Sequence, residues 1–180
     1  SAFSSSSVSL TLQVNDINNQ PVLDVTTSPI VMTAIDEGDA GTTTTAVVDV
    51  SSVVTITDSD TGASSGIAIT SASTSNGYWE YSSDNATWTA VPTVSVTSAL
   101  VLDLSYYLRF VSTGPDGVTA TLDFVAWDQT DGYTSESTNA DTTGSSDPTS
   151  AYSVDTNSFS VLVNDLNDAP ELAGVSTSLG

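Results

Sequence analysis

The chain has 180 residues, with 22 acidic residues against a single basic one, Arg109, and a formal net charge of -21. That balance excludes binding to nucleic acids or to anionic membrane surfaces, because phosphate groups are bound by cations. The chain has no cysteine and no histidine, which excludes disulfides, thiol catalysis and sites built on imidazole. No apolar run approaches the roughly 18 residues of a membrane span, so we expect no direct membrane insertion.

Short segments rich in Val, Ile, Thr and aromatic residues follow one another along the chain, separated by Gly, Asp, Asn and Ser. No segment has the 3.6-residue period of a long helix. Many short strands joined by polar turns predict an all-β fold, an antiparallel Greek-key β-sandwich. The predicted strands span residues 8–14, 29–34, 46–50, 53–57, 67–71, 78–82, 94–97, 106–111, 119–127 and 158–163.

The first of these segments has an apolar face made by Val8, Leu10, Leu12 and Val14, which alternate with polar residues. Left unpaired, it would expose both that face and a row of backbone hydrogen-bonding groups. We therefore predict that residues 8–14 pair, either along an edge of this domain or with a neighbouring molecule.

Two other segments are poor strand candidates. Residues 36–45 contain Glu-Gly-Asp-Ala-Gly and a run of threonines, and residues 131–149 are almost wholly Ser, Thr, Asn, Asp and Gly. The second segment is typical of a long surface loop. A loop of that length is either functional or mobile, and we expect mobility.

One stretch of the sequence occurs twice. Residues 14–21 read Val-Asn-Asp-Ile-Asn-Asn-Gln-Pro, and residues 163–170, at an offset of 149, read Val-Asn-Asp-Leu-Asn-Asp-Ala-Pro. A fixed separation between two copies indicates a repeat protein. We therefore expect residues 1–21 to be the last strand and linker of a preceding repeat, 22–168 to be one repeat, and 169–180 to begin the next.

Both copies place carboxylates and amides at alternate positions before a proline, and such hard oxygen ligands suit calcium. Three further acidic motifs lie between the copies: Ile35-Asp36-Glu37-Gly38, Thr57-Asp58-Ser59-Asp60-Thr61-Gly62 and Ala126-Trp127-Asp128. The second of them is also an ordinary turn sequence, because Asp side chains accept hydrogen bonds from nearby backbone amides. Asp58 and Asp60 are therefore either metal ligands or turn-forming residues.

In this order, the repeated linker and the three acidic motifs resemble cadherin-like repeats of the large calcium-dependent surface adhesins of bacteria, of the RTX and biofilm-associated type. The resemblance covers nearly the whole chain and implies a cadherin-like or immunoglobulin-like sandwich with Ca²⁺ at each junction. The first linker departs from the pattern at Asn19, where the second has Asp168. The ligands that the resemblance implies are Asp16, Asn18, Asp58, Asp60 and Asp128 at the first junction, and Glu37, Asp165, Asn167 and Asp168 at the second.

The aromatic stretch 78–88 has two interpretations. Trp79, Tyr81 and Trp88 are candidates for a ligand-binding platform for sugars, in a segment similar to the Asp-box turn of sialidases. Alternatively, the stretch is a hairpin with Asp84 and Asn85 in its turn and a tryptophan in the core. Arg109, in an apolar strand, is expected to form a structural salt bridge.

No pair of acids is set in an apolar environment that marks a glycosidase, so we do not expect an enzyme. The sequence instead indicates a secreted module of a bacterial cell-surface adhesin. Its partners would be the neighbouring repeats of the same polypeptide, and calcium would stiffen each junction so that the module acts as a spacer. The alternative is that this repeat binds a surface glycan or peptide itself, through residues 74–90 or 131–149.

Overall fold

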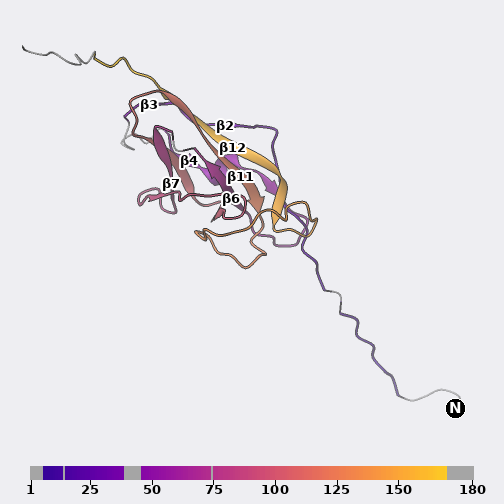
Figure 1. Cartoon of the computed structure of the whole chain (residues 1–180). Coiled ribbons are helices and arrows are strands. Elements are labelled where there is room, and N and C mark those ends of the chain that lie inside the picture. The colour runs from indigo at the N-terminus through magenta and orange to yellow at the C-terminus, as the bar shows by residue number, and fades with distance from the viewer. Residues whose placement is uncertain (1–5, 14, 39–45, 74, 170–180) are drawn as a thin grey trace, which may run out of the picture.

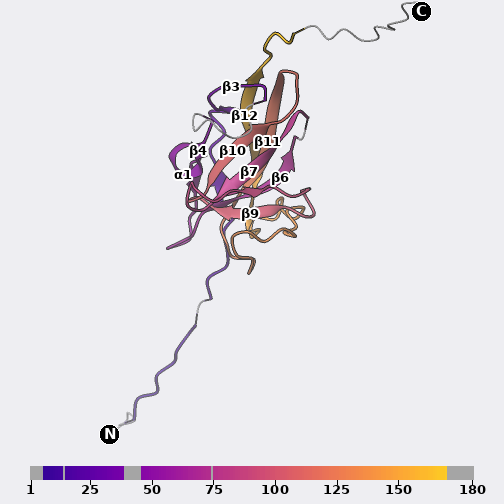
Figure 2. The same cartoon turned by 90° about the vertical axis from the view of Figure 1, so that its left-hand side faces the viewer.

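A computed structural model of the chain describes residues 6–13, 15–38, 46–73 and 75–169. In these residues, two β-sheets lie face to face and the chain leaves from opposite ends of the pair (Figures 1 and 2). The single helix that is described, α1 (Val50–Val53), is one turn long. No helix of the described residues is long and apolar enough to cross a membrane.

The larger sheet has the strand order β2-β12-β11-β6-β9, with β3 also paired to β12. Its pairs are antiparallel, except that β2 and β3 run parallel to β12. The smaller sheet has the order β4-β10-β7-β8, and β1 pairs with β5 in a separate two-stranded ribbon. The strands of the larger sheet are β2 (Ile30–Val31), β3 (Ile35–Asp36), β6 (Gly66–Ala72), β9 (Leu100–Asp103), β11 (Val118–Trp127) and β12 (Tyr152–Asn164). The remaining strands are β1 (Val22–Leu23), β4 (Val48–Asp49), β5 (Ile56–Thr57), β7 (Gly77–Ser82), β8 (Thr89–Ala90) and β10 (Tyr107–Ser112).

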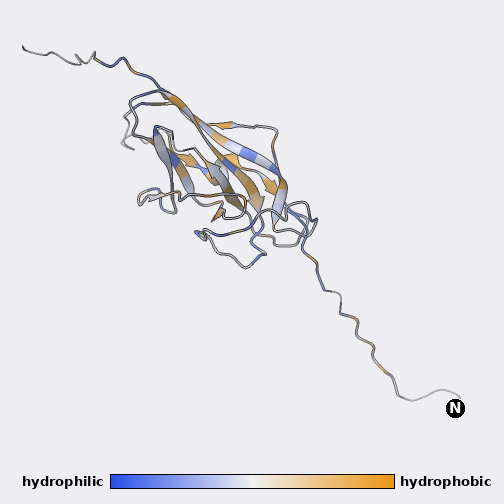
Figure 3. Ribbon diagram, in the orientation of Figure 1, coloured by the Kyte–Doolittle hydropathy of each residue, from blue (hydrophilic) through white to orange (hydrophobic). Residues whose placement is uncertain are grey.

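Side chains from both sheets form the main core. Along β12, Phe159, Val161 and Val163 are buried and alternate with more exposed residues, as a strand with one buried face requires. Phe159 stacks on Phe124 of β11 with ring centroids 5.0 Å apart. Figure 3 shows apolar residues following the strands of both sheets. The prediction of an all-β fold with mainly antiparallel sheets, arranged as a sandwich, is therefore confirmed.

The outer face of the larger sheet carries a second apolar cluster, which residues 131–149 help to cover. Trp127 of β11 is fully buried there, together with Val101 of β9 and Ala140 of the loop. Asp131 fixes the loop, because Oδ1 accepts from Trp127 Nε1 at 3.1 Å and Oδ2 accepts from the Tyr152 hydroxyl. The segment that we expected to be a mobile surface loop is therefore packed against the sheet.

The aromatic stretch forms the hairpin of β7 and β8. Trp79 is 1% exposed and Tyr81 is 7% exposed, so both are core residues, and the surface platform that we considered is not built from them. Trp88, just before β8, is half-buried, with the Arg109 guanidinium 4.2 Å from its ring centroid. Arg109 also pairs with Glu80, its partner across the strands, at 2.7 Å, which is the structural role expected for it.

Asp84 organises the turn of this hairpin. Its carboxylate accepts hydrogen bonds from the backbone amides of Ala86 and Thr87 and from the Ser82 hydroxyl, and these bonds lower its pKa to about 2. Asn85 follows with a φ of 55°, a left-handed conformation that Asn tolerates better than most residues. The turn therefore depends on an ionised Asp84.

We predict that Asp84→Ala lowers the stability of the domain, and that the deficit depends on pH. The folded-state pKa of Asp84 lies below its ordinary value of 3.8, so its contribution is present above pH 3.8 and is lost as the pH falls through about 2. Urea unfolding of wild type and variant should therefore converge between pH 4 and pH 2. Asp155→Ala, which removes an exposed acid on β12, is the control, and an equal deficit in it would contradict the assignment.

Several predicted strands differ from the observed ones. Residues 8–13 form no strand in the structure, and Val8, Leu10 and Leu12 are 94%, 97% and 83% exposed. Val14 lies outside the described residues. Residues 94–97 form a turn instead of a strand, and β9 was not predicted.

Candidate metal site at the entering linker

The first linker lies against the end of the sandwich where β11 finishes. Asn18 Nδ2 donates to Asp128 Oδ2 at 2.8 Å and lies 3.2 Å from the backbone oxygens of both Thr149 and Ser150. Three oxygens from two parts of the chain therefore converge on one atom of the linker. Oxygens placed in this way favour a positive partner at their centre.

Asp128 is held by its own turn. It is 2% exposed, and its Oδ1 accepts from the backbone amide and the hydroxyl of Thr130 at 2.9 and 2.6 Å. The other oxygen, Oδ2, is the one that faces Asn18. A cavity of about 330 Å³ opens beside them, lined by Asn18, Asp60, Thr61, Gly62, Ala63, Ser64, Asp128, Gln129 and Thr130.

Asp60 lies on the same cavity and holds the next residue of the linker. Its Oδ2 accepts from the Asn19 backbone amide at 2.8 Å and its Oδ1 from Asn19 Nδ2 at 2.5 Å. These two hydrogen bonds lower the pKa of Asp60 below its ordinary value of 3.8. The carboxylate that we expected to meet Asp16 or Asn18 thus binds Asn19.

Asp58 fits both interpretations of its motif. Its Oδ1 accepts from the Asp60 backbone amide at 2.9 Å, which is the turn geometry expected of Asp, and Gly62 completes the turn with a φ of +79°. Its Oδ2 is buried and has no hydrogen-bond partner. A buried carboxylate oxygen without a hydrogen-bond donor costs free energy. The turn therefore explains the position of Oδ1 but not the burial of Oδ2.

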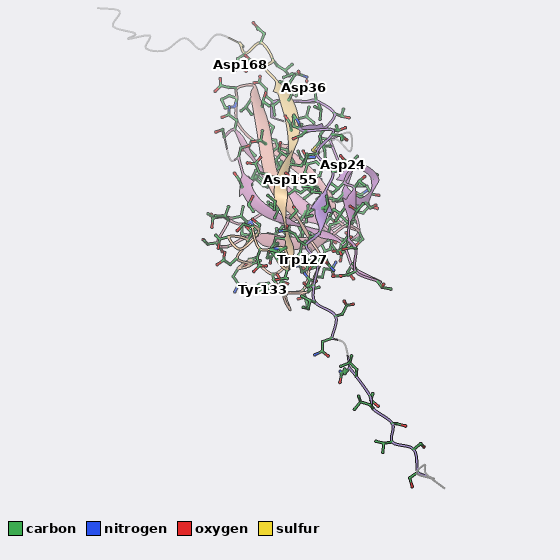
Figure 4. All side chains as sticks on the ribbon, turned by 90° about the vertical axis from the view of Figure 1, so that its right-hand side faces the viewer. Asp24, Asp36, Trp127, Tyr133, Asp155 and Asp168 are labelled. Atoms are coloured by element: carbon green, nitrogen blue, oxygen red, sulfur yellow. The ribbon has the colours of Figure 1, made fainter. Side chains whose placement is uncertain are left out.

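The opposite end of the sandwich repeats part of this arrangement with Glu37 and the second linker. Glu37 Oε1 accepts from the Leu166 backbone amide at 3.0 Å, whereas Oε2 is buried without a partner. Beside it, Asn164 Nδ2 donates to Asp36 Oδ1 at 3.0 Å. Figure 4 shows Asp36 and Asp168 at this end, and Trp127 and Tyr133 toward the other.

The remaining predicted ligands are not gathered into either arrangement. Asp16, Asp165, Asn167 and Asp168 are exposed, and Glu37 binds the backbone of the second linker in place of its acids. Among the described residues, no group of three or more acidic side chains is close enough to hold a metal ion. The first junction instead brings carboxylate and backbone oxygens together around amide nitrogens of the linker.

Three contributors to this junction were missed by sequence reasoning. The carbonyls of Thr149 and Ser150 carry no side-chain signal, since any residue type has a carbonyl. Gln20 fixes the linker to the loop, with Nε2 donating to the backbone oxygens of Ser145 and Tyr152, and its backbone amide donating to Pro148 at 3.0 Å. Of the three contributors, only Gln20 acts through a side chain that the sequence could have pointed to.

Comparison with known proteins adds no family assignment. No protein-family model matches the chain, no curated protein matches its sequence, and no solved structure matches its fold.

We predict that the linker detaches from Asp60 at low pH. Because the folded-state pKa of Asp60 is lowered, its stabilising contribution is present above the ordinary value of 3.8 and is lost as the pH falls through the lower, folded-state value. The amide resonance of Asn19 should therefore be constant from pH 7 to pH 4.5 and should shift below that range in an NMR titration. A shift centred near pH 6 would contradict the contact.

Proposed function

We propose that this domain is a calcium-stiffened repeat of a secreted bacterial surface adhesin, and that it acts as a spacer. The observation that carries the proposal is the convergence of Asp128 Oδ2 and the carbonyl oxygens of Thr149 and Ser150 on the linker residue Asn18. These contacts of Asn18 join the linker to the domain at a point surrounded by oxygen atoms. Stiffness at that point decides whether successive domains stay in line.

The residues fit calcium better than other common metals. Calcium takes six to eight oxygen ligands and accepts carboxylates, amide oxygens and backbone carbonyls in flexible geometry. The junction offers the carboxylates of Asp128 and Asp60 and the carbonyls of Thr149 and Ser150, and Asn18 would add its Oδ1 once its amide rotates and Nδ2 leaves these oxygens. Asp58, which accepts a hydrogen bond from the Asp60 amide, has a buried oxygen without a partner. When bound, calcium would supply the positive charge that these oxygens share, in a chain with a net charge of -21.

The strand order supports a Greek-key, immunoglobulin-like or cadherin-like sandwich. Immunoglobulin-like folds place strands B, E and D in one sheet and C, F and G in the other. Lettering β4, β6, β7, β10, β11 and β12 in chain order as B to G gives B-E-D for the smaller sheet and C-F-G for the larger, which are the observed neighbours. The short strands β8 and β9 are additions at sheet edges.

The repeat organisation has support from the strands as well as from the linkers. At the offset of 149, Leu10 and Leu12 align with Phe159 and Val161, two core residues of β12. Residues 6–13 thus have the core pattern of a last strand, and they extend away from the domain described here (Figure 1). We infer that they belong to a preceding sandwich of the same kind, in line with the predicted partner.

The alternative, that this repeat itself binds a glycan or peptide through its aromatic residues, has less support. Trp79 and Tyr81 are inside the core, and the ring of Trp88 is occupied by Arg109. The outer face of the larger sheet, which residues 131–149 help to cover, does not offer a second aromatic platform either, because Trp127 is buried beneath this loop. A spacer role is the better conclusion.

A tandem chain tests the proposal. Because Pro170 aligns with Pro21, a second copy of residues 22–170 can follow Pro170 directly and preserve the 149-residue period. Small-angle scattering should show a longer, stiffer particle in calcium and a shorter, flexible one in chelator. Identical scattering in both conditions would reject calcium stiffening.

A further inference from the structure

The part of the chain that follows the first linker runs alongside the last strand. This entering segment, residues 20–37, lies parallel to residues 152–166, and the sequence separation between bonded partners stays between 127 and 133. Figure 4 shows this order in space, with Asp24 and Asp155 midway along the sandwich and Asp36 toward its far end. The parts of the chain that enter and leave the domain are therefore joined directly to each other.

Backbone hydrogen bonds join the entering segment to β12 wherever the segment forms a strand. β2 and β3 both pair in parallel with β12. Just after β2, the Met32 amide donates to the Ser160 oxygen at 2.8 Å, and just after β3, the Glu37 amide donates to the Asn164 oxygen at 3.0 Å. The segment also contributes buried apolar side chains to the main core, namely Leu23, Ile30, Met32 and Ile35.

Side chains hold the entering segment where strand pairing with β12 is missing. At the entry end, Gln20 Nε2 donates to the backbone oxygen of Tyr152. Midway, Asn157 of β12 is 3% exposed, and its Nδ2 donates to the backbone oxygen of Thr27 at 3.0 Å. At the exit end, Glu37 Oε1 accepts a hydrogen bond from the backbone of the second linker at 3.0 Å. The attachment thus extends over the full length of the segment.

Tension between the two linkers would load these contacts together. The chain enters beside the start of β12 and leaves from the end of β12 (Figure 1), so such a force pulls two parallel segments past each other. Hydrogen bonds between parallel strands are evenly spaced along the pair, and a pull along the strands strains all of them at once. A pull at one end of the pair would instead break them one after another.

We propose that the entering segment and β12 form a force-bearing clamp, which resists tension along the chain because its contacts must break together. The clamp goes beyond the proposed function, since it requires neither calcium nor a second repeat. The strands from β4 to β11 lie outside the direct line between the linkers and carry little load until the clamp breaks. Residues 20–166, extended at ~3.3–3.6 Å per residue, would span roughly 500 Å, so rupture releases a length of that order.

Pulling single chains from two different pairs of points tests the clamp. The chain has no cysteine, so thiol-linked handles attach only at introduced cysteines. Ser7→Cys with Ala169→Cys places end-to-end handles beyond both ends of the clamp, and Ser7→Cys with Ser146→Cys places same-end handles at its entry end, where Gln20 bonds the neighbouring Ser145. All three substituted positions are exposed, so the comparison leaves the clamp itself unchanged.

In chelator, the rupture force with end-to-end handles should be at least about twice that with same-end handles, because forced unfolding is governed by the unfolding barrier and the end-to-end pull must break several contacts together. The end-to-end rupture should release its length in one step. Equal forces in the two geometries would overturn the clamp.

Substitutions at Met32 and Gln20 locate the resistance within the clamp. Met32→Ala and Met32→Pro both remove a buried side chain, but only proline also removes the backbone N–H that donates to Ser160. With end-to-end handles, Met32→Pro should lower the rupture force more than Met32→Ala does. Gln20→Ala, which removes a half-buried contact at the entry end, should lower it relative to the unsubstituted chain and serves as the test if the proline variant does not fold.

The outcomes separate the clamp from calcium binding. A Met32→Pro chain as resistant as Met32→Ala, or a Gln20→Ala chain as resistant as the unsubstituted one, would place the resistance elsewhere and overturn the clamp. Because the forces are measured in chelator, a failure of the clamp would leave the proposed calcium site untouched. A chain that binds no calcium would still show the difference between the two pulling geometries.

Discussion

Replacing Trp127 with alanine should lower the free energy of unfolding by about 3–5 kcal/mol, the range for truncating a large buried aromatic side chain. Trp127 is fully buried at the end of β11, where it fills the second apolar cluster. Its Nε1 also holds Asp131, which anchors the loop over the sheet. For a domain of this size each kcal/mol shifts the melting temperature by ~2–4 °C, so the expected fall exceeds about 6 °C.

Two further variants locate the source of that loss. Trp127→Phe keeps most of the apolar surface but loses the hydrogen bond to Asp131. Its free energy of unfolding, measured in urea, should lie between those of wild type and Trp127→Ala. Val154→Ala, at a position 64% exposed on β12, should change stability little. If Trp127→Ala were as stable as the Val154 variant, the packing of residues 131–149 against the sheet would be wrong.

Removing calcium should lower the melting temperature by at least about 5 °C. One ion that binds only the folded chain, present at ~100 times its dissociation constant, adds ~2.7 kcal/mol, and the shift follows from the same ~2–4 °C per kcal/mol. In its absence the carboxylate and carbonyl oxygens at the first junction lose the cation that balances their charge. Magnesium should substitute poorly, because it requires a tighter octahedral shell than mixed carboxylates, amides and carbonyls provide.

Asp58→Asn combined with Asp60→Asn should remove most of this calcium response and leave the β-sheet circular dichroism spectrum intact. The matched control is Asp116→Asn with Asp155→Asn, which removes the same charge from two exposed acids outside the linker contacts. Melting curves in calcium, in magnesium and in chelator compare the three proteins. Coincident wild-type curves in all three conditions would mean that Asp58 and Asp60 are turn residues and surface charge alone.

The long strands of the fold were predictable because their alternation is strong. β11 and β12 each place a regular series of apolar residues on one face, and a period of two indicates such strands from sequence alone. Residues 8–13 have the same alternation, yet they form no strand in the described chain, and Val8, Leu10 and Leu12 are exposed. Periodicity shows that a strand is possible, whereas pairing depends on a partner.

Other errors arose where local pattern and tertiary environment disagree. Residues 100–102, Leu-Val-Leu, are buried on both sides of β9 and so show no alternation. The polar composition of residues 131–149 predicted a mobile loop, but Tyr133 and Ala140 within it pack on the second cluster. A few apolar residues can anchor a long polar segment when the sheet beneath it offers an apolar outer face.

The candidate site was predictable in its side chains but not in its contacts. Spacing and resemblance selected Asn18, Asp60 and Asp128, and the structure places all three on one cavity. Which linker residue meets which acid depends on the path of the backbone, so the pairing of Asn19 with Asp60 emerged only from the structure. The backbone carbonyls at the junction leave no trace in sequence.

A calcium titration of the ¹⁵N-labelled chain, followed by NMR, tests the central claim most directly. Calcium at the first junction should shift the backbone amides of Asn18, Asp60, Asp128 and Thr130 together and to saturation, while amides of the core strand β11 near Leu122 stay constant. Magnesium at the same concentration should produce smaller changes. If the amides at the junction do not move, or if all exposed acids respond weakly and alike without saturation, calcium does not occupy this site and the proposed function is wrong.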